Sequence, residues 1–169
     1  TLTKPTLETS SYTYDGNSKT PTVNNFNSTY MEKTATSVSG ATNAGSYSIV
    51  VNLKDTSNCQ WQGGGNGSVT LNWVINRKLL TAAQSTFSQS GTMTYTGVSQ
   101  NVLISGYSST YHDLSSETSA VNAGTYVAKV TPKANYAFSD GSYSAKSVSW
   151  VIGKAPFAQP TLTNTSFTY

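Results

Sequence analysis

The chain has few of the residues from which most catalytic, metal-binding and nucleic-acid-binding sites are built. Its 169 residues include one cysteine and one histidine, and only 10% are charged. The single cysteine, Cys59, excludes a disulfide within the chain, and no cysteine–histidine spacing suits zinc. The only arginine, Arg77, and a net charge of +3 leave little for contacts to phosphates or bases. We therefore expect no cofactor, no metal and no nucleic-acid partner.

Long apolar runs and strong helix formers are also scarce. No apolar stretch approaches the ~18 residues of a membrane-spanning helix, so we expect no membrane insertion in this segment. No window repeats apolar residues at the i, i+3, i+4, i+7 spacing of an amphipathic helix. Serine, threonine and asparagine are abundant, and 11 tyrosines accompany a low net charge, which favours a folded chain over a disordered one. The composition predicts an all-β protein.

The sequence repeats itself at a spacing of about 80 residues. Residues 43–47 (Asn-Ala-Gly-Ser-Tyr) return at 122–126 as Asn-Ala-Gly-Thr-Tyr, and the Trp-Val-Ile that begins at Trp73 returns at Trp150. A period of this length is enough for each copy to form a small domain with its own core.

The repeat predicts where the domains begin and end. The first copy spans residues 1–76 and the second spans 77–153. Residues 154–169 form a linker and the first strand of a truncated third copy, because residues 160–169 match residues 5–14. Neither junction between copies holds a glycine- or serine-rich linker, so we expect an elongated arrangement.

Several segments alternate apolar and polar side chains, as strands with one buried face do. The predicted buried faces are Tyr47, Ile49, Val51 and Leu53; Val69, Leu71, Trp73 and Ile75; Tyr126, Ala128 and Val130; and Val148, Trp150 and Ile152. Six or seven short strands in each copy predict a two-sheet sandwich, although another small all-β topology would satisfy the same alternation.

The sequence resembles two known groups of domains. The Asn-Ala-Gly-x-Tyr stretches resemble the approach to strand F in immunoglobulin domains, where a tyrosine hydroxyl bonds back to nearby backbone. The chain is more closely similar to the bacterial Ig-like repeat modules of surface proteins and adhesins (MBG or YDG type). The motifs that carry this resemblance are Tyr-Asp-Gly at residues 14–16 with Pro21 downstream, Asn-Ala-Gly-x-Tyr, and Trp-Val-Ile followed by Lys78 or Lys154.

The resemblance covers nearly the whole chain, and the second copy departs from it with Tyr-Thr-Gly at residues 95–97. It implies two tandem Ig-like β-sandwich domains of an extracellular protein on the cell surface or cell wall. It carries over no ligand residues.

Few residues are candidates for chemistry. His112 lies in a polar stretch without a nucleophile elbow, and we interpret it as a surface histidine. Cys59 aligns with Tyr136 of the second copy, so its position calls for a bulky or apolar filler rather than for sulfur. Trp61 and Phe138 occupy matching positions, where they either pack in the core or form a glycan-stacking platform with Tyr136. No catalytic, cofactor-binding or metal-binding residue is predicted.

These observations favour a non-catalytic, monomeric stalk region of a bacterial cell-surface protein or adhesin. Its partner would be a host or cell-surface glycan or protein. The alternatives are a glycan-binding module of a secreted or surface protein and an accessory domain of a secreted hydrolase.

Overall fold

The structure, a computed structural model, describes residues 1–161 and Tyr169. These residues form sixteen strands and no helix, which confirms the prediction of an all-β protein. It follows that no described segment is a helix with the length and apolar character needed to cross a membrane. Most of the predicted third copy, at 160–169, lies outside the described residues.

The chain divides into two compact units that do not coincide with the sequence repeats. Unit 1 comprises Thr1–Ser85 and Pro132–Ser144, and unit 2 comprises Thr86–Thr131 and Ala145–Tyr169. The chain therefore passes from one unit to the other at three points along its length. The domain ranges 1–76 and 77–153 follow the sequence repeat and stay a prediction.

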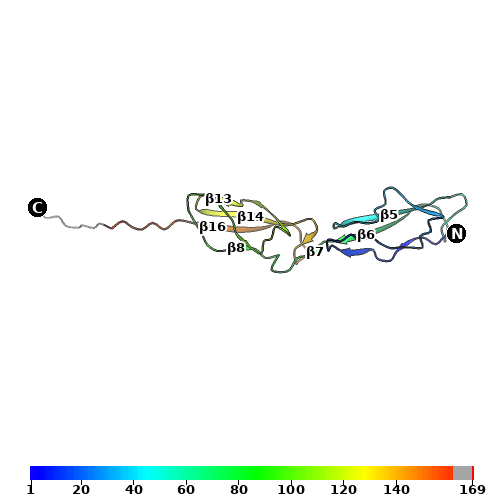
Figure 1. The fold of residues 1–169 in the computed structure, drawn as a ribbon, viewed down its shortest axis with the longest axis horizontal. Coiled ribbons are helices and arrows are strands. Elements are labelled where there is room, and N and C mark those ends of the chain that lie inside the picture. The colour runs from blue at the N-terminus through cyan, green and yellow to red at the C-terminus, as the bar shows by residue number, and fades with distance from the viewer. Residues whose placement is uncertain (162–168) are drawn as a thin grey trace. The chain divides into compact units, whose positions relative to one another are not determined.

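Unit 1 is built on a four-stranded mixed sheet in the order β2-β6-β5-β4, of which β5 and β6 are labelled in Figure 1. The strands are β2 (Ser11–Thr13), β4 (Met31–Lys33), β5 (Gly45–Leu53) and β6 (Val69–Asn76). β6 runs antiparallel to β5 and parallel to β2, and β5 is antiparallel to β4. Two short pairs complete the unit: β1 (Thr6–Leu7) with β3 (Val23–Asn24), antiparallel, and β7 (Lys78–Leu79) with β15 (Tyr136–Ala137), parallel.

Unit 2 repeats this sheet in the order β9-β16-β14-β12. The strands are β9 (Met93–Thr94), β12 (His112–Ser116), β14 (Gly124–Pro132, whose last residue falls in unit 1) and β16 (Lys146–Gly153). β16 is antiparallel to β14 and parallel to β9. Two short antiparallel pairs accompany it: β8 (Ser88–Gln89) with β11 (Ile104–Ser105), and β10 (Gln100–Asn101) with β13 (Ser119–Ala120).

The predicted buried faces of the long strands are confirmed for most of their residues, whereas Tyr47, Val69, Leu71 and Tyr126 are only half-buried. Ile49, Val51 and Leu53 of β5 are buried together with Trp73 and Ile75 of β6. The matching positions of unit 2 are buried as well: Ala128 and Val130 of β14, and Val148, Trp150 and Ile152 of β16. Burying one such aliphatic side chain contributes about 1.5–3 kcal/mol, so these two strand pairs supply much of the stability of each unit.

Candidate functional site

The feature that both units preserve is a corner at the start of β5 and of β14, which we call the Asn–Tyr corner. The Tyr47 hydroxyl donates a hydrogen bond to the backbone carbonyl of Asn43 at 2.7 Å. The Tyr126 hydroxyl donates in the same way to the carbonyl of Asn122, also at 2.7 Å. This confirms the hydroxyl-to-backbone bond that the resemblance to immunoglobulin strand F predicts.

Each corner tyrosine also lies against the buried tryptophan of the neighbouring strand. Strand register pairs Tyr47 with Trp73 and Tyr126 with Trp150. The ring centroids are 4.7 Å and 4.8 Å apart, and both pairs are tilted by 31°. Aromatic pairs in this range add about 0.5–1.5 kcal/mol beyond the area that they bury. The corner therefore holds the tyrosine over the tryptophan and closes one side of the core.

The indole nitrogens complete the arrangement. Trp73 Nε1 donates to the carbonyl of Val38 at 3.0 Å, and Trp150 Nε1 donates to the carbonyl of Glu117 at 2.7 Å. A buried indole N–H without a partner would cost about 1–3 kcal/mol, so these bonds allow the rings to sit inside. Each bond ties the tryptophan to a segment that lies earlier in the chain. In unit 1 this segment precedes β5, and in unit 2 it precedes β14.

The glycine of the Asn-Ala-Gly-x-Tyr motif leaves room for the side chain of the tyrosine that follows it. A Cβ atom on Gly45 would lie 3.2 Å from the Tyr47 hydroxyl oxygen, and one on Gly124 would lie 3.3 Å from that of Tyr126. A Cβ atom at this place would push the hydroxyl by a few tenths of an ångström and so disturb its bond to the carbonyl. The motif is therefore explained by packing and hydrogen bonding within the fold.

We expect Gly45→Ala and Tyr47→Phe each to lower the free energy of unfolding by about 1 kcal/mol, because the first disturbs the hydroxyl-to-carbonyl bond and the second removes it. Urea denaturation followed by circular dichroism measures the change. Gly67→Ala is the matched control, since no atom lies within 4 Å of the added Cβ and its φ is not positive. Equal midpoints for Gly45→Ala and Gly67→Ala would contradict this account of the motif.

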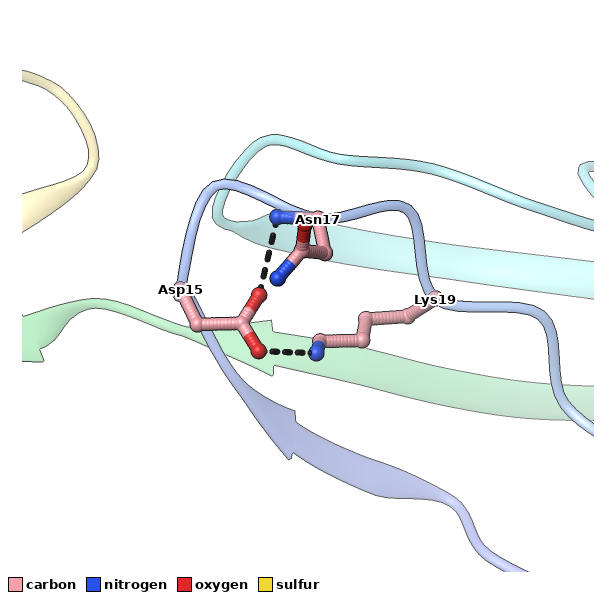
Figure 2. Close-up of polar contacts among 3 residues, drawn as sticks. All are labelled: Asp15, Asn17 and Lys19. Atoms are coloured by element: carbon pink, nitrogen blue, oxygen red, sulfur yellow. Dashed lines mark hydrogen bonds and ion pairs between the residues drawn. The ribbon is translucent and has the colours of Figure 1, made fainter.

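The turn at Asp15 and Gly16 is an exposed polar clamp (Figure 2). The Asp15 carboxylate accepts a hydrogen bond from Lys19 Nζ at 2.5 Å and another from the Asn17 N–H at 2.9 Å. The hydrogen bond from Lys19 and then that from the Asn17 backbone lower the pKa of Asp15 below its ordinary value. An ionised, exposed carboxylate of this kind stabilises a turn and is not suited to act as a general acid.

His112 is not on the surface, and the sequence-based interpretation was wrong on this point. It begins β12 and is only 1% exposed. The rings of Phe87, Tyr107 and Tyr111 lie around it, with centroids 5.2–6.4 Å away. Its Nδ1 accepts the N–H of Ser108 at 3.2 Å.

The reason is that His112 occupies a core position that both copies share. In unit 1 the N–H groups of Tyr30 and Met31 both donate to the carbonyl of Asn27, and Met31 is buried. In unit 2 the N–H groups of residues 111 and 112 donate to the carbonyl of residue 108 in the same pattern. Aligning the copies at these turns would have assigned His112 to the slot of Met31, where a bulky side chain packs.

We expect His112→Met to change the free energy of unfolding by less than about 1.5 kcal/mol, because methionine already fills the equivalent slot. His112→Ala should cost about 2–5 kcal/mol by leaving a cavity. Thermal and urea unfolding of the two variants distinguish a packing role from a chemical one. Equal losses in both would mean that the imidazole makes a contribution that methionine cannot replace.

The residues proposed as a glycan platform are mostly inside the fold. Trp61 is 2% exposed and Phe138 is fully buried, while Tyr136 is half-buried. Trp61 also donates from Nε1 to the carbonyl of Gly67 at 2.6 Å. Cys59 is partly buried and packs against the core of unit 1, which confirms its interpretation as a filler. A sugar-stacking platform needs exposed ring faces, and neither Trp61 nor Phe138 presents one.

Other parts of the surface offer little chemistry. Within the part of the chain that the structure describes, no group of three or more histidine, cysteine, aspartate or glutamate side chains could hold a metal ion. A shallow groove in unit 1 runs over β2, β5 and β6, and its lining includes Ser46, Ser48 and Tyr47 but no carboxylate, histidine, lysine, arginine or cysteine. Such a lining has no nucleophile–base pair.

Comparisons with protein-family models, with curated proteins and with solved structures found no match to this chain.

Proposed function

We propose that the chain is a non-catalytic stalk region of a bacterial cell-surface protein or adhesin, made of tandem, elongated Ig-like β-sandwich modules. The supporting observation is that the two copies share their core contacts, whereas they do not share their potentially reactive side chains. The Asn–Tyr corner and its tryptophan stack occur twice with nearly identical geometry. A spacer needs each module to be stable, and it does not need a reactive group in each.

The candidate reactive groups each occur once. His112 stands where the first copy has Met31, and Cys59 stands where the second copy has Tyr136. Asp15 of the turn clamp stands where the second copy has Thr96. Side chains that are replaced between copies without loss of the fold serve packing or turns locally, and this favours a mechanical role over an enzymatic one.

The connection between the copies also supports a stalk. Residues Pro132–Ser144 come from the second sequence repeat, yet they belong to the same compact unit as the whole first repeat. Their strand β15 pairs in parallel with β7, which follows β6 after one intervening residue, Arg77. The residues next to the junction at 76–77 thus lie in paired strands of unit 1 rather than in a glycine–serine linker, which favours a spacer.

Small-angle X-ray scattering of the full chain tests the proposed shape. A compact globule of this length would have a radius of gyration of about 15 Å. We expect a clearly larger value and a pair-distance distribution with a long tail. A value near about 15 Å would overturn the elongated stalk.

Titration with sugars, followed by tryptophan fluorescence, tests the alternative glycan-binding role. We expect no response at millimolar concentration. A saturable response that is lost on mutation of Tyr136, the half-buried member of the proposed platform, would instead favour glycan binding.

A further inference from the structure

The Asn–Tyr corner of unit 1 receives a segment from the second sequence repeat. Asn135 Oδ1 accepts the N–H of Ala44 at 2.8 Å, and Asn135 Nδ2 donates to Asn43 Oδ1 at 3.0 Å. The side-chain amide thus bonds in both directions, once with backbone and once with a side chain. Both bonds lie within unit 1, although the partners are about 90 residues apart in the chain.

Two more contacts surround this amide. The rings of Tyr14 and Tyr136 meet edge to face, with centroids 5.6 Å apart. Arg77 Nε donates to the carbonyl of Ala134 at 3.0 Å. We call residues 134–136 the plug, and Tyr14, Asn43, Ala44 and Arg77 the socket of unit 1.

Unit 2 has a second socket at the equivalent positions. Tyr95 corresponds to Tyr14, because each donates its N–H to the backbone at the end of the last long strand, Gly153 and Asn76 respectively. Asn122 and Ala123 correspond to Asn43 and Ala44 by the repeated motif. Lys154 corresponds to Arg77, because each is the second residue after Trp-Val-Ile. These four residues line one hollow together with Ala155 and Phe157.

The walls of this hollow suit a plug of the same kind. Its lining is mainly apolar, and Phe157 is 98% exposed beside it. The Lys154 ammonium can donate to a backbone carbonyl as Arg77 does in unit 1, since both side chains carry N–H donors and no acceptor. The Asn122 side chain and the Ala123 N–H present the same acceptor and donor that hold Asn135 in unit 1.

We propose that the unit 2 socket binds the Asn58–Cys59 segment of a second copy of the first repeat, so that repeats join through one recurring plug-and-socket contact. Asn58 is the counterpart of Asn135, and it is exposed. Its side chain is already oriented by a bond from Nδ2 to Asp55 Oδ2 at 2.7 Å, and the second Nδ2 hydrogen is available to Asn122. This inference extends the proposed stalk role by naming how one module would be held to the next.

A covalent extension of the chain tests this contact at high effective concentration. Residues 160–169 match residues 5–14, so a copy of residues 15–85 added after Tyr169 completes another first repeat in register. Amide hydrogen exchange at Ala123 is the readout. We expect exchange to slow roughly tenfold in the extended chain, as a newly formed hydrogen bond would cause.

Two variants make the test specific. Asn58→Ala in the added copy alone should restore fast exchange at Ala123. Asn135→Ala in the original chain is the matched control, and it should accelerate exchange at Ala44 by a similar factor.

A second extension guards against failure of the added copy to fold. It appends residues 96–154 after Tyr169 and so supplies the Asn135–Tyr136 plug that unit 1 already binds. Protection at Ala123 in the first extension, lost with Asn58→Ala, supports the proposal; where the added first repeat does not fold, protection in the second extension that is lost with its plug asparagine takes its place. Unchanged exchange at Ala123 in that folded extension overturns the plug-and-socket proposal. The stalk role is tested separately, by the scattering experiment.

Discussion

Replacing Trp150 with alanine is expected to lower the free energy of unfolding by about 3–5 kcal/mol. The side chain is fully buried, stacks on Tyr126 and donates from Nε1 to the Glu117 carbonyl. Alanine would leave a large cavity, remove the stack and take away the donor to the Glu117 carbonyl. Because small domains are stable by only about 5–15 kcal/mol, much of unit 2 should unfold at mild urea concentrations.

Two control variants separate the indole from its strand. Trp150→Phe keeps a ring against Tyr126 but loses the Nε1 bond, so we expect an intermediate loss of about 1–3 kcal/mol. Val151→Ala changes the next residue on the opposite face, which is 44% exposed, and should stay within about 0.5 kcal/mol. Urea midpoints for the three variants should follow that order. A Trp150→Ala variant as stable as Val151→Ala would contradict a tryptophan-centred core.

Trp61→Ala is expected to lower the free energy of unfolding by a similar amount, about 3–5 kcal/mol. The ring is buried in the core of unit 1, and its Nε1 is bonded to the Gly67 carbonyl. A glycan platform would respond differently, because exposed stacking residues can be truncated with little effect on stability. Thermal unfolding and sugar titration of the same variant therefore distinguish the two interpretations.

The matching residue Phe138 should behave alike, since it is fully buried at the equivalent position. Leu79→Ala is the control for apolar truncation, because Leu79 is largely exposed and should change stability by no more than about 0.5 kcal/mol. A stable Trp61→Ala variant that loses a saturable sugar response would restore the glycan-binding hypothesis and remove Trp61 from the core.

Features that depend on local order along the chain could be predicted from sequence. The buried faces of β5, β6, β14 and β16 follow from the two-residue period of a strand. The Asn–Tyr corner spans only four residues, and its motif occurs twice. The burial of His112 is not evident from its residue type, and it follows instead from the turn that both copies share.

Pairings between distant segments could not be predicted in the same way. β2 lies parallel to β6 although about 60 residues separate them, and alternation alone is the same for parallel and antiparallel neighbours. The parallel pairing of β9 with β16 could not be predicted from alternation either. Neither follows from the turn residues, because no short connection joins the paired strands.

The amino-acid sequence by itself determined an all-β protein made of repeated copies with tryptophan-centred cores, because periodicity and recurrence are properties of the order of residues. Only the tertiary structure decided which strands are neighbours, that His112 is buried, and that Pro132–Ser144 belongs to the unit of the first repeat. Those outcomes depend on which distant surfaces best bury apolar area and satisfy polar groups together. The amide of Asn135, held by Asn43 and Ala44, is one such case.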